Sequence, residues 1–256
     1  MAPALHRAFD WRGPDRLVLV HGFTQTLQSW AGMAPTLAET YQVTRVDLPG
    51  HGGSANVDLP FAEAAAAVGD AGGTATYVGY SMGGRLCLRL AVDRPDLVQA
   101  LVLVGASPGL ADDGERAARR ASDEALADEI ERVGTAAFLE RWLAQPMFST
   151  FEPEPADLEA RLANPSRGLA TALRRLGTGV QEPLWDRLGE LEMPVLVVAG
   201  QEDSKFTGIA EDMADAIGVN AQVVAIAGAG HAAHLERPGS FCRLLAAFLV
   251  LHPPAP

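Results

Sequence analysis

Short apolar runs alternate with helical patterns along this chain, and this alternation limits the fold more than any other feature. The apolar or β-branched runs are LVLV (17–20), VTRVD (43–47), TATYVGY (74–80), ALVLVG (100–105), VLVVAG (195–200) and QVVAIAG (222–228). Helical patterns occupy segments 29–40, 82–93 and 239–251. Buried strands that alternate with helices build a parallel sheet covered on both faces. The sequence therefore predicts an α/β fold with a mostly parallel sheet and helices on both faces.

The segment between residues 107 and 190 departs from this alternation. It is rich in Ala, Arg and Glu, and its apolar residues recur at helical spacing with few β-branched runs. Segments 152–157 and 163–166 contain prolines and polar residues typical of internal turns. We predict a helical cap (107–190) that is inserted between two strands of a core formed by 1–106 and 191–256.

The composition narrows the classes of partner. The chain has 256 residues and a net charge of −12, which argues against nucleic acid and anionic membrane surfaces. It has no apolar run long enough to span a membrane. Cys87 and Cys242 lie in apolar helical contexts and are expected to be buried thiols, which fits a cytoplasmic protein. Both a monomer and a homo-oligomer stay open.

The stretch VGYSMGGR (78–85) places Ser81 between glycines directly after an apolar run. A strand that turns at once into a helix strains the corner residue, and small flanking residues let the two backbones pass. The pattern G-x-S-x-G in this context predicts a nucleophile elbow. Ser81 Oγ should project at the end of the sheet, beside the N-terminus of a helix that begins at Met82.

A serine hydroxyl needs an adjacent base to become reactive. Asp203 follows the run 195–200, and His231 lies in the Gly-rich loop after the run 222–228. This is the chain order Ser, acid, His that the architecture requires, and the ends of parallel strands meet at one edge of the sheet. We predict a Ser81–His231–Asp203 triad, with Glu202 as the alternative acid.

Two backbone N–H groups are candidates for an oxyanion hole. Phe23 follows the first strong strand in VHGFTQ (20–25), and Met82 directly follows Ser81. Both N–H groups are expected to converge on a developing negative charge near the serine hydroxyl.

Three other histidines have structural interpretations. His21 and His51, in HGF and PGHG, are expected to hold loop structure by hydrogen bonds rather than to titrate in catalysis. His234, three residues after His231, is either a substrate contact or a surface residue.

The basic residues are unevenly distributed. Nineteen of the 20 are arginines, and ten of these fall between residues 107 and 190. They either decorate the solvent-facing surface of helices or bind an anionic ligand. Lys205, the only lysine, lies two residues after Asp203 and is either exposed or part of a pocket beside the triad.

Longer segments carry a family resemblance. HGF (21–23), DLPGHGGS (47–54) and GYSMGGR (79–85) resemble the α/β-hydrolase superfamily. More narrowly, the chain resembles the 2-succinyl-6-hydroxy-2,4-cyclohexadiene-1-carboxylate (SHCHC) synthase family of menaquinone biosynthesis. The segments that carry this resemblance are GASPGL (105–110), ERAARRASD (115–123), RWLAQPMFS (141–149), RLANP (161–165), GTGVQEPLW (177–185), DSKF (203–206) and GHAAHLERP (230–238). They extend along nearly the whole chain, cap included.

The resemblance implies an α/β-hydrolase fold and a lyase. Enzymes of this family eliminate pyruvate from 2-succinyl-5-enolpyruvyl-6-hydroxy-3-cyclohexene-1-carboxylate without a metal or a cofactor, and the triad serves as general base. The substrate is a small polycarboxylate with three carboxylates, which charge-assisted hydrogen bonds can hold. The implied substrate-binding residues are Tyr80, Arg85, Arg120 (with Arg119 as the alternative), Trp142, Arg161 and Lys205.

Two other functions stay open from the sequence. A carboxylesterase or carbon–carbon bond hydrolase would use Ser81 as a covalent nucleophile, although an arginine-rich cap argues against neutral esters. A non-catalytic binding protein of this fold would have little reason to keep a complete triad and both oxyanion loops.

Overall fold

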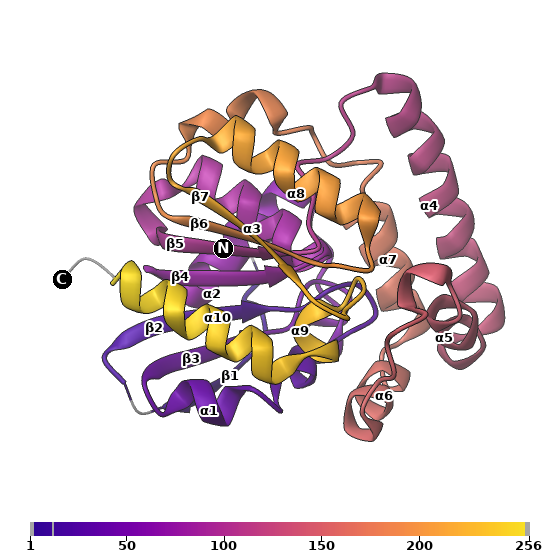
Figure 1. Cartoon of the computed structure of the whole chain (residues 1–256). Helices are drawn as coiled ribbons and strands as arrows, with labels where there is room; N and C mark the ends of the chain where they lie inside the picture. The colour runs from indigo at the N-terminus through magenta and orange to yellow at the C-terminus, as the bar shows by residue number, and fades with distance from the viewer. Residues whose placement is uncertain (1–2, 12, 254–256) are drawn as a thin grey trace.

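A seven-stranded sheet lies at the centre of the computed structural model, which describes residues 3–11 and 13–253 (Figure 1). The strand order is β1-β3-β2-β4-β5-β6-β7. The strands are β1 (Arg7–Trp11), β2 (Asp15–Val20), β3 (Tyr41–Val46), β4 (Ala75–Tyr80), β5 (Val98–Val104), β6 (Val195–Gly200) and β7 (Ala221–Ile226). All neighbours pair in parallel except β1, which pairs antiparallel with β3 at the edge. The predicted, mostly parallel sheet is confirmed.

Helices cover both faces of the sheet because its strands are apolar on both sides. Along β2, Val18 and Val20 belong to one apolar core, and Leu17 and Leu19 to the other. The first core includes α2 (Phe61–Gly72), α3 (Met82–Asp93) and α8 (Ser204–Ile217), and the second includes α1 (Ala34–Ala38) and α10 (Pro238–Leu251). Figure 1 shows these two helical layers on opposite sides of the strands. The sheet is thus buried on both faces, as a parallel sheet requires.

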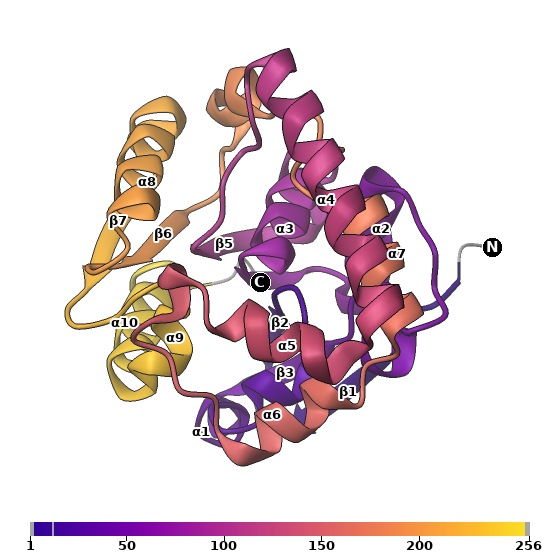
Figure 2. The same cartoon turned by 90° about the vertical axis from the view of Figure 1, so that its right-hand side faces the viewer.

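Four helices between β5 and β6 form a cap beside the sheet. They are α4 (Asp113–Val133), α5 (Thr135–Leu143), α6 (Pro155–Leu162) and α7 (Ser166–Leu176). Figure 1 shows them gathered on one side of the molecule, and in Figure 2 α4, α5 and α6 form an arc in front of the strands. The predicted insertion of a helical cap between two strands is confirmed. Its exact limits, residues 107 and 190, stay a prediction.

The remaining helical elements are short. They are α9 (Ala233–Glu236) and five 3₁₀ turns at Leu27–Trp30, Gly52–Ser54, Pro95–Leu97, Pro146–Phe148 and Trp185–Glu190. Within the described ranges, no helix is long and apolar enough to span a membrane.

The helix predicted over 29–40 is wrong as a single element. The chain instead forms the 3₁₀ turn Leu27–Trp30 and then α1 (Ala34–Ala38). Pro35 explains the break, because a proline is tolerated in the first turn of a helix but disrupts a helix interior. Strand β1 (Arg7–Trp11) was not predicted, since its sequence RAFDW contains no β-branched residue.

The two cysteines differ in burial. Cys87 is buried, as expected, whereas Cys242 in α10 is only partly buried, and neither forms a disulfide.

Close backbone contact explains the glycines around Ser81. A Cβ on Gly79 would lie 2.6 Å from the Gly84 Cα, and one on Gly83 would lie 2.4 Å from the His21 carbonyl oxygen. Real Cβ atoms do not approach other atoms this closely, so α3 can start against β2 and β4 only if these positions lack side chains. The elbow geometry therefore follows directly from the sequence.

Substitution of Gly83 tests this constraint. We expect Gly83→Ala to lower the free energy of unfolding by about 1–3 kcal/mol, because the added methyl group must displace backbone atoms. The control is Gly208→Ala in α8, where a Cβ meets no atom within 4 Å. That variant should be neutral or more stable by up to about 1 kcal/mol. Urea unfolding of both variants checks the prediction, and equal effects would contradict it.

Candidate active site

Ser81 occupies a sharp turn between β4 and α3. Its φ of 50° and ψ of −109° form a strained combination for a residue other than glycine. Its N–H donates to the Val104 carbonyl oxygen (2.8 Å), and its own carbonyl oxygen accepts from the Arg85 N–H (3.0 Å). These bonds hold the hydroxyl beyond the end of β4, beside the free N–H groups at the start of α3.

His231 contacts both other members of the predicted triad. Its Nδ1 lies 2.8 Å from Asp203 Oδ2, and its Nε2 lies 3.3 Å from Ser81 Oγ. Asp203 can accept the Nδ1–H, which leaves Nε2 free to take the serine proton. The alternative acid, Glu202, is exposed. The structure thus brings the three predicted residues together, and their catalytic role stays a prediction.

The two candidate oxyanion donors lie at the same place. Phe23 and Met82 line the cavity that contains Ser81. Within the described part of the chain, neither backbone N–H donates to another group. Both donors are therefore available to an oxygen bound beside Ser81, as the predicted oxyanion hole requires.

A cavity of about 320 Å³ opens in front of Ser81 and His231. Three basic side chains line it: Arg85 from the core, Arg119 from the cap and Lys205 from the start of α8. None of the described lining residues is Asp or Glu, although the whole chain has a net charge of −12. Aromatic rings form much of the apolar wall, namely Phe23, Trp142, Phe148 and Phe206. The cavity is suited to an anionic ligand.

Arg85 brings a buried positive charge to this cavity. The residue is 7% exposed, and its guanidinium donates to Gln181 Oε1 (2.9 Å) and to the Leu176 carbonyl oxygen (2.7 Å). Both acceptors are neutral. Burial, followed by repulsion from Arg119, lowers the pKa of Arg85 to about 9, so the side chain is still charged at neutral pH. A buried cation without a carboxylate partner favours a bound anion.

Comparison with known proteins identifies the family. A family model described as alpha/beta hydrolase fold matches residues 15–238. The protein of Serratia proteamaculans (strain 568) named 2-succinyl-6-hydroxy-2,4-cyclohexadiene-1-carboxylate synthase is 32% identical over 243 residues, covering 91% of this chain and 92% of that protein. A Bacillus subtilis (strain 168) protein, provisionally given the same name, is 34% identical over 252 residues, covering 92% and 90%. The structure of MenH from S. aureus has 30% identity and a TM-score of 0.88, and covers 96% and 98%. The chain belongs to the SHCHC synthase family.

For this SHCHC synthase family member, the position of α4 distinguishes the two neighbouring arginines. Arg119 lines the cavity and pairs with Asp123 (Nε–Oδ1, 2.7 Å). Arg120 instead donates to the Gly179 carbonyl oxygen from Nε (3.3 Å) and Nη2 (3.2 Å). A Cβ on Gly179 would lie 2.3 Å from the Arg120 backbone nitrogen, so α4 packs directly on that loop. The structure therefore differs from the prediction, which placed Arg120 in the pocket.

Arg161 also lies outside the cavity lining. It is 2% exposed, pairs with Asp157 (Nε–Oδ2, 2.6 Å) and donates from Nη1 to Thr24 Oγ1 (2.9 Å). The side chain thus holds the loop that carries Phe23, rather than facing the predicted substrate directly.

Three other predicted residues do line the cavity, namely Tyr80, Trp142 and Lys205. Tyr80 is nearly buried, and this burial raises the pKa of its hydroxyl, which therefore stays protonated. The indole Nε1–H of Trp142 is buried and has no acceptor among the described residues. Both groups can donate to a bound oxygen.

His234 is neither a surface residue nor part of the cavity lining. It is fully buried, and its ring lies 4.5 Å from the rings of both Trp30 and Tyr80, centroid to centroid. Burial holds the pKa of His234 well below its usual value, so the ring is neutral. Both interpretations drawn from the sequence are therefore wrong, and His234 packs as a core aromatic ring.

Two residues that the sequence analysis did not single out shape the His231 loop. The Glu236 carboxylate accepts the N–H of Gly230 (2.7 Å) and of Ala232 (3.0 Å), on either side of His231. Gly105 has φ +55°, and a Cβ there would lie 3.0 Å from His231 Cε1. Two sequence signals could have identified them: Glu236 is a carboxylate five residues after His231, and Gly105 is a glycine at the end of an apolar run.

Two buried histidines connect the Phe23 loop to the loop that follows β3. His21 Nε2 accepts the Leu48 N–H (3.0 Å), and His51 Nε2 accepts the Thr24 N–H (3.2 Å). Each ring donates its other N–H to a nearby backbone carbonyl oxygen. The expectation that His21 and His51 hold loop structure is confirmed.

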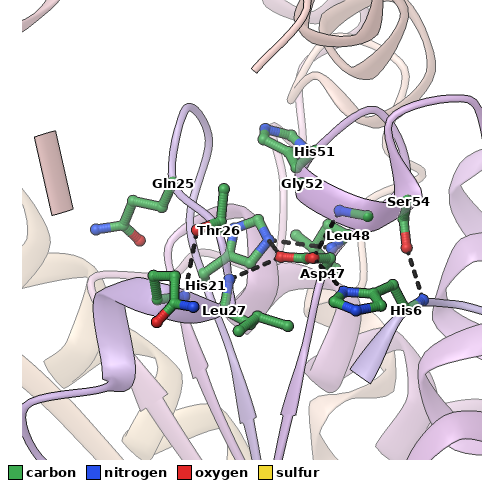
Figure 3. Close-up of polar contacts among 12 residues, drawn as sticks. His6, His21, Gln25, Thr26, Leu27, Asp47, Leu48, His51, Gly52 and Ser54 are labelled. Carbon is green, nitrogen blue, oxygen red and sulfur yellow. Dashed lines mark hydrogen bonds and ion pairs between the residues drawn. The ribbon is translucent and has the colours of Figure 1, made fainter. Parts of the chain in front are cut away.

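Asp47 strengthens the same connection. Its carboxylate is 2% exposed and accepts the N–H of Leu27 (2.8 Å) and of Gly53 (2.8 Å). It also contacts His6 Nδ1 (2.7 Å), and Figure 3 shows Asp47 lying between His6 and His21.

Within the part of the chain that the structure describes, no group of three or more His, Cys, Asp or Glu side chains is placed to hold a metal ion.

Acid titration tests the neutral state of His51. Burial, followed by repulsion from His21, lowers the pKa of His51 from 6.5 to about 3. The unfolded chain takes up a proton near pH 6.5, whereas the folded chain does not. Stability is therefore lost as the pH falls from about 6.5 toward 3, by about 1.4 kcal/mol per pH unit.

We expect His51→Gln to remove this acid-induced loss of stability. Between about pH 7 and pH 5 the variant should lose less unfolding free energy than the wild type, measured by urea denaturation. Above about pH 7.5 both proteins should have the same pH slope, which serves as the internal control. Equal acid losses would contradict a neutral, buried His51.

Proposed function

We propose that this protein is a carbon–oxygen lyase that eliminates pyruvate from 2-succinyl-5-enolpyruvyl-6-hydroxy-3-cyclohexene-1-carboxylate. The other product is 2-succinyl-6-hydroxy-2,4-cyclohexadiene-1-carboxylate, which belongs to menaquinone biosynthesis. One observation carries the proposal: Ser81 and His231 open into a cavity whose other ionisable lining residues are Tyr80 and the basic Arg85, Arg119 and Lys205. Membership in the SHCHC synthase family supports the same reaction.

Ser81 acts as the proton acceptor in this proposal. His231 Nε2, 3.3 Å from Ser81 Oγ, takes the hydroxyl proton, and Asp203 stabilises the imidazolium that results. The serine alkoxide then removes the proton from C2, the ring carbon bonded to the succinyl carbonyl. The electron pair of that C–H bond forms the C2–C3 double bond, the C3–C4 double bond of the substrate shifts to C4–C5, and the bond from C5 to the enolpyruvyl oxygen breaks. The leaving enolpyruvate takes up the proton that His231 holds and becomes pyruvate, while Ser81 keeps the proton from C2, so no water is consumed.

The oxyanion donors lower the barrier of the proton transfer. As the C–H bond breaks, negative charge develops on the succinyl carbonyl oxygen. The free N–H groups of Phe23 and Met82 can both donate hydrogen bonds to that oxygen. Preorganised donors of this kind contribute about 3–4 kcal/mol each to transition-state stabilisation.

The basic lining holds the three carboxylates of the substrate. Arg85 is buried without a carboxylate partner, Arg119 shares its charge with Asp123, and Lys205 lies beside the triad. Charge-assisted hydrogen bonds from these groups fix the ring so that the acidic C–H faces Ser81.

The same proposal places the protein in the cytoplasm, where two cysteines that form no disulfide stay reduced.

A coupled assay for pyruvate tests the proposal. Wild-type protein should release pyruvate from the substrate, detected as NADH oxidation by lactate dehydrogenase. We expect Ser81→Ala and His231→Ala to lower kcat by about 10³-fold or more, because triad members act as a unit. His252→Ala is the control, since His252 caps the C-terminus of α10 and is not among the residues that line the cavity.

Other outcomes would refute the proposal. Absence of pyruvate at high concentrations of wild-type protein would exclude the reaction. A loss of less than tenfold in His231→Ala would refute the role of His231 as base. Fast hydrolysis of 4-nitrophenyl acetate without pyruvate release would instead indicate a hydrolase with Ser81 as covalent nucleophile.

The neighbouring arginines of α4 offer a matched pair of variants. Arg119→Ala should raise KM by about 10- to 100-fold, because a charge-assisted hydrogen bond contributes about 1.5–3 kcal/mol. Arg120→Ala should change KM by less than about threefold, since Arg120 donates to the Gly179 carbonyl oxygen outside the cavity. Steady-state kinetics of both variants check this assignment, and a larger effect at Arg120 would reverse it.

A further inference from the structure

Thr24 has an unusual backbone conformation beside a candidate oxyanion donor. Among the described residues other than glycine, only Thr24 (φ 69°) and Ser81 (φ 50°) have a positive φ. A β-branched residue rarely adopts this conformation, and surrounding contacts must hold it there. Thr24 directly follows Phe23 and is fully buried. The contacts that hold Thr24 therefore bear on the shape of the Phe23 loop.

Two of the three hydrogen bonds of Thr24 described below come from the cap. The carbonyl oxygen of Thr24 accepts Asn164 Nδ2–H (2.9 Å), and its hydroxyl accepts from Arg161 Nη1 (2.9 Å). The third contact is from the core, where the Thr24 N–H donates to His51 Nε2 (3.2 Å). The backbone of Thr24 is thus held on one side by the core and on the other side by the cap.

Asn164 joins three segments through a single side chain. It lies between α6 and α7 and is 3% exposed. Besides donating to Thr24, its Nδ2 lies 3.4 Å from the Gln25 carbonyl oxygen, and its Oδ1 accepts the Gly52 N–H (2.8 Å). Figure 3 shows that Gln25 and Gly52 belong to the two loops that Asp47 and His51 also connect. Asn164 adds the cap to that network.

Backbone contact between the cap and the core fixes the position of Asn164 relative to the two loops. A Cβ on Gly50 would lie 2.3 Å from the Gly168 carbonyl oxygen, and a Cβ on Gly168 would lie 2.5 Å from the Gly50 carbonyl oxygen. The cap segment that follows Asn164 therefore rests directly on the loop after β3. This close contact holds the Asn164 amide within hydrogen-bond range of both loops.

We propose that Asn164 is a positioning residue that couples the cap to the oxyanion hole. Its amide holds Thr24 in the left-handed conformation and thereby fixes the Phe23 loop so that the Phe23 N–H faces Ser81. The loop is also closed by the Gly22 N–H, which donates to Gln25 Oε1 (2.7 Å). Without the Asn164 amide, the loop keeps its core contacts and the Arg161 hydrogen bond to the Thr24 hydroxyl, but its backbone loses the hydrogen bond to the Thr24 carbonyl oxygen. The inference rests on the proposed function, because it assigns Phe23 the role of oxyanion donor.

The first test separates positioning from binding in the pyruvate assay. Asn164→Ala should lower kcat by about 10- to 100-fold, somewhat less than deletion of an oxyanion donor, while KM changes by less than about threefold. Asn164→Asp keeps the acceptor for the Gly52 N–H but loses the donor to Thr24, so it should show the same loss of kcat. A rise in KM with kcat retained would overturn the proposal.

Two controls separate positioning from loosening of the cap. Thr135 Oγ1 donates to the Asn164 carbonyl oxygen (2.8 Å), so Thr135→Val disturbs the same segment without touching the amide. Arg175 pairs with Asp58 (2.7 Å), so Arg175→Ala cuts a contact between the cap and the core that lies outside the Phe23 loop. Both variants should keep kcat within about twofold. A loss of kcat in Thr135→Val equal to that in Asn164→Ala would overturn the proposal.

A second readout does not need the proposed substrate. Diethyl 4-nitrophenyl phosphate labels an activated serine: Ser81 Oγ bonds to phosphorus, 4-nitrophenolate leaves, and His231 takes the serine proton. The phosphoryl oxygen occupies the oxyanion hole during this step. Asn164→Ala should slow the labelling of Ser81 by about 10- to 100-fold, and an unchanged rate would overturn the proposal. If the wild type releases no pyruvate, the proposed function is refuted. If Asn164→Ala still slows the labelling in that case, the role of Asn164 is supported independently.

Discussion

The start of α3 depends on three backbones meeting without side chains between them. A Cβ on Gly79 would lie 2.6 Å from the Gly84 Cα, and one on Gly83 would lie 2.4 Å from the His21 carbonyl oxygen. Because these positions are glycines, α3 begins directly after β4 and Ser81 is held at φ 50°. The same contact places the elbow against His21, the residue that starts the Phe23 loop. Ser81 and one candidate oxyanion donor are thus positioned by a single packing constraint.

The arginines of the surface and of the cavity differ in how their charges are paired. On the surface, Arg174 pairs with three carboxylates of α4: Glu124, Asp128 and Glu131. Exposed pairs of this kind contribute little to binding or stability, because water and salt screen them. At the cavity, by contrast, Arg85 has only neutral partners. Of the two arginines that line the cavity, Arg119 pairs with Asp123, so the positive charge of the site depends most on Arg85.

Features encoded by local patterns could be predicted from the sequence. The elbow is a continuous motif, and the positions of Asp203 and His231 follow from where strands of a parallel sheet end. Features set by packing between distant segments could not be predicted. Whether Arg119 or Arg120 faces the cavity depends on how α4 rests on Gly179, and the sequence does not encode that register locally. The burial of His234 could not be predicted, because it lies between Trp30 and Tyr80, which come from two distant parts of the chain.

The triad alone does not distinguish a hydrolase from a lyase. The same serine oxygen, activated by the same imidazole, can attack a carbonyl carbon or remove a proton from a neighbouring carbon. The outcome depends on which atom of the ligand is held in front of that oxygen. In this cavity the buried guanidinium of Arg85 is already desolvated before a ligand arrives, and its pKa is lowered to about 9 by burial. In the proposed reaction, a substrate carboxylate pairs with this charge, and the positions of the carboxylates determine which carbon faces Ser81. Under this proposal, specificity for elimination is a property of the charged cavity lining and of the loops that hold the candidate oxyanion donors, rather than of the triad itself.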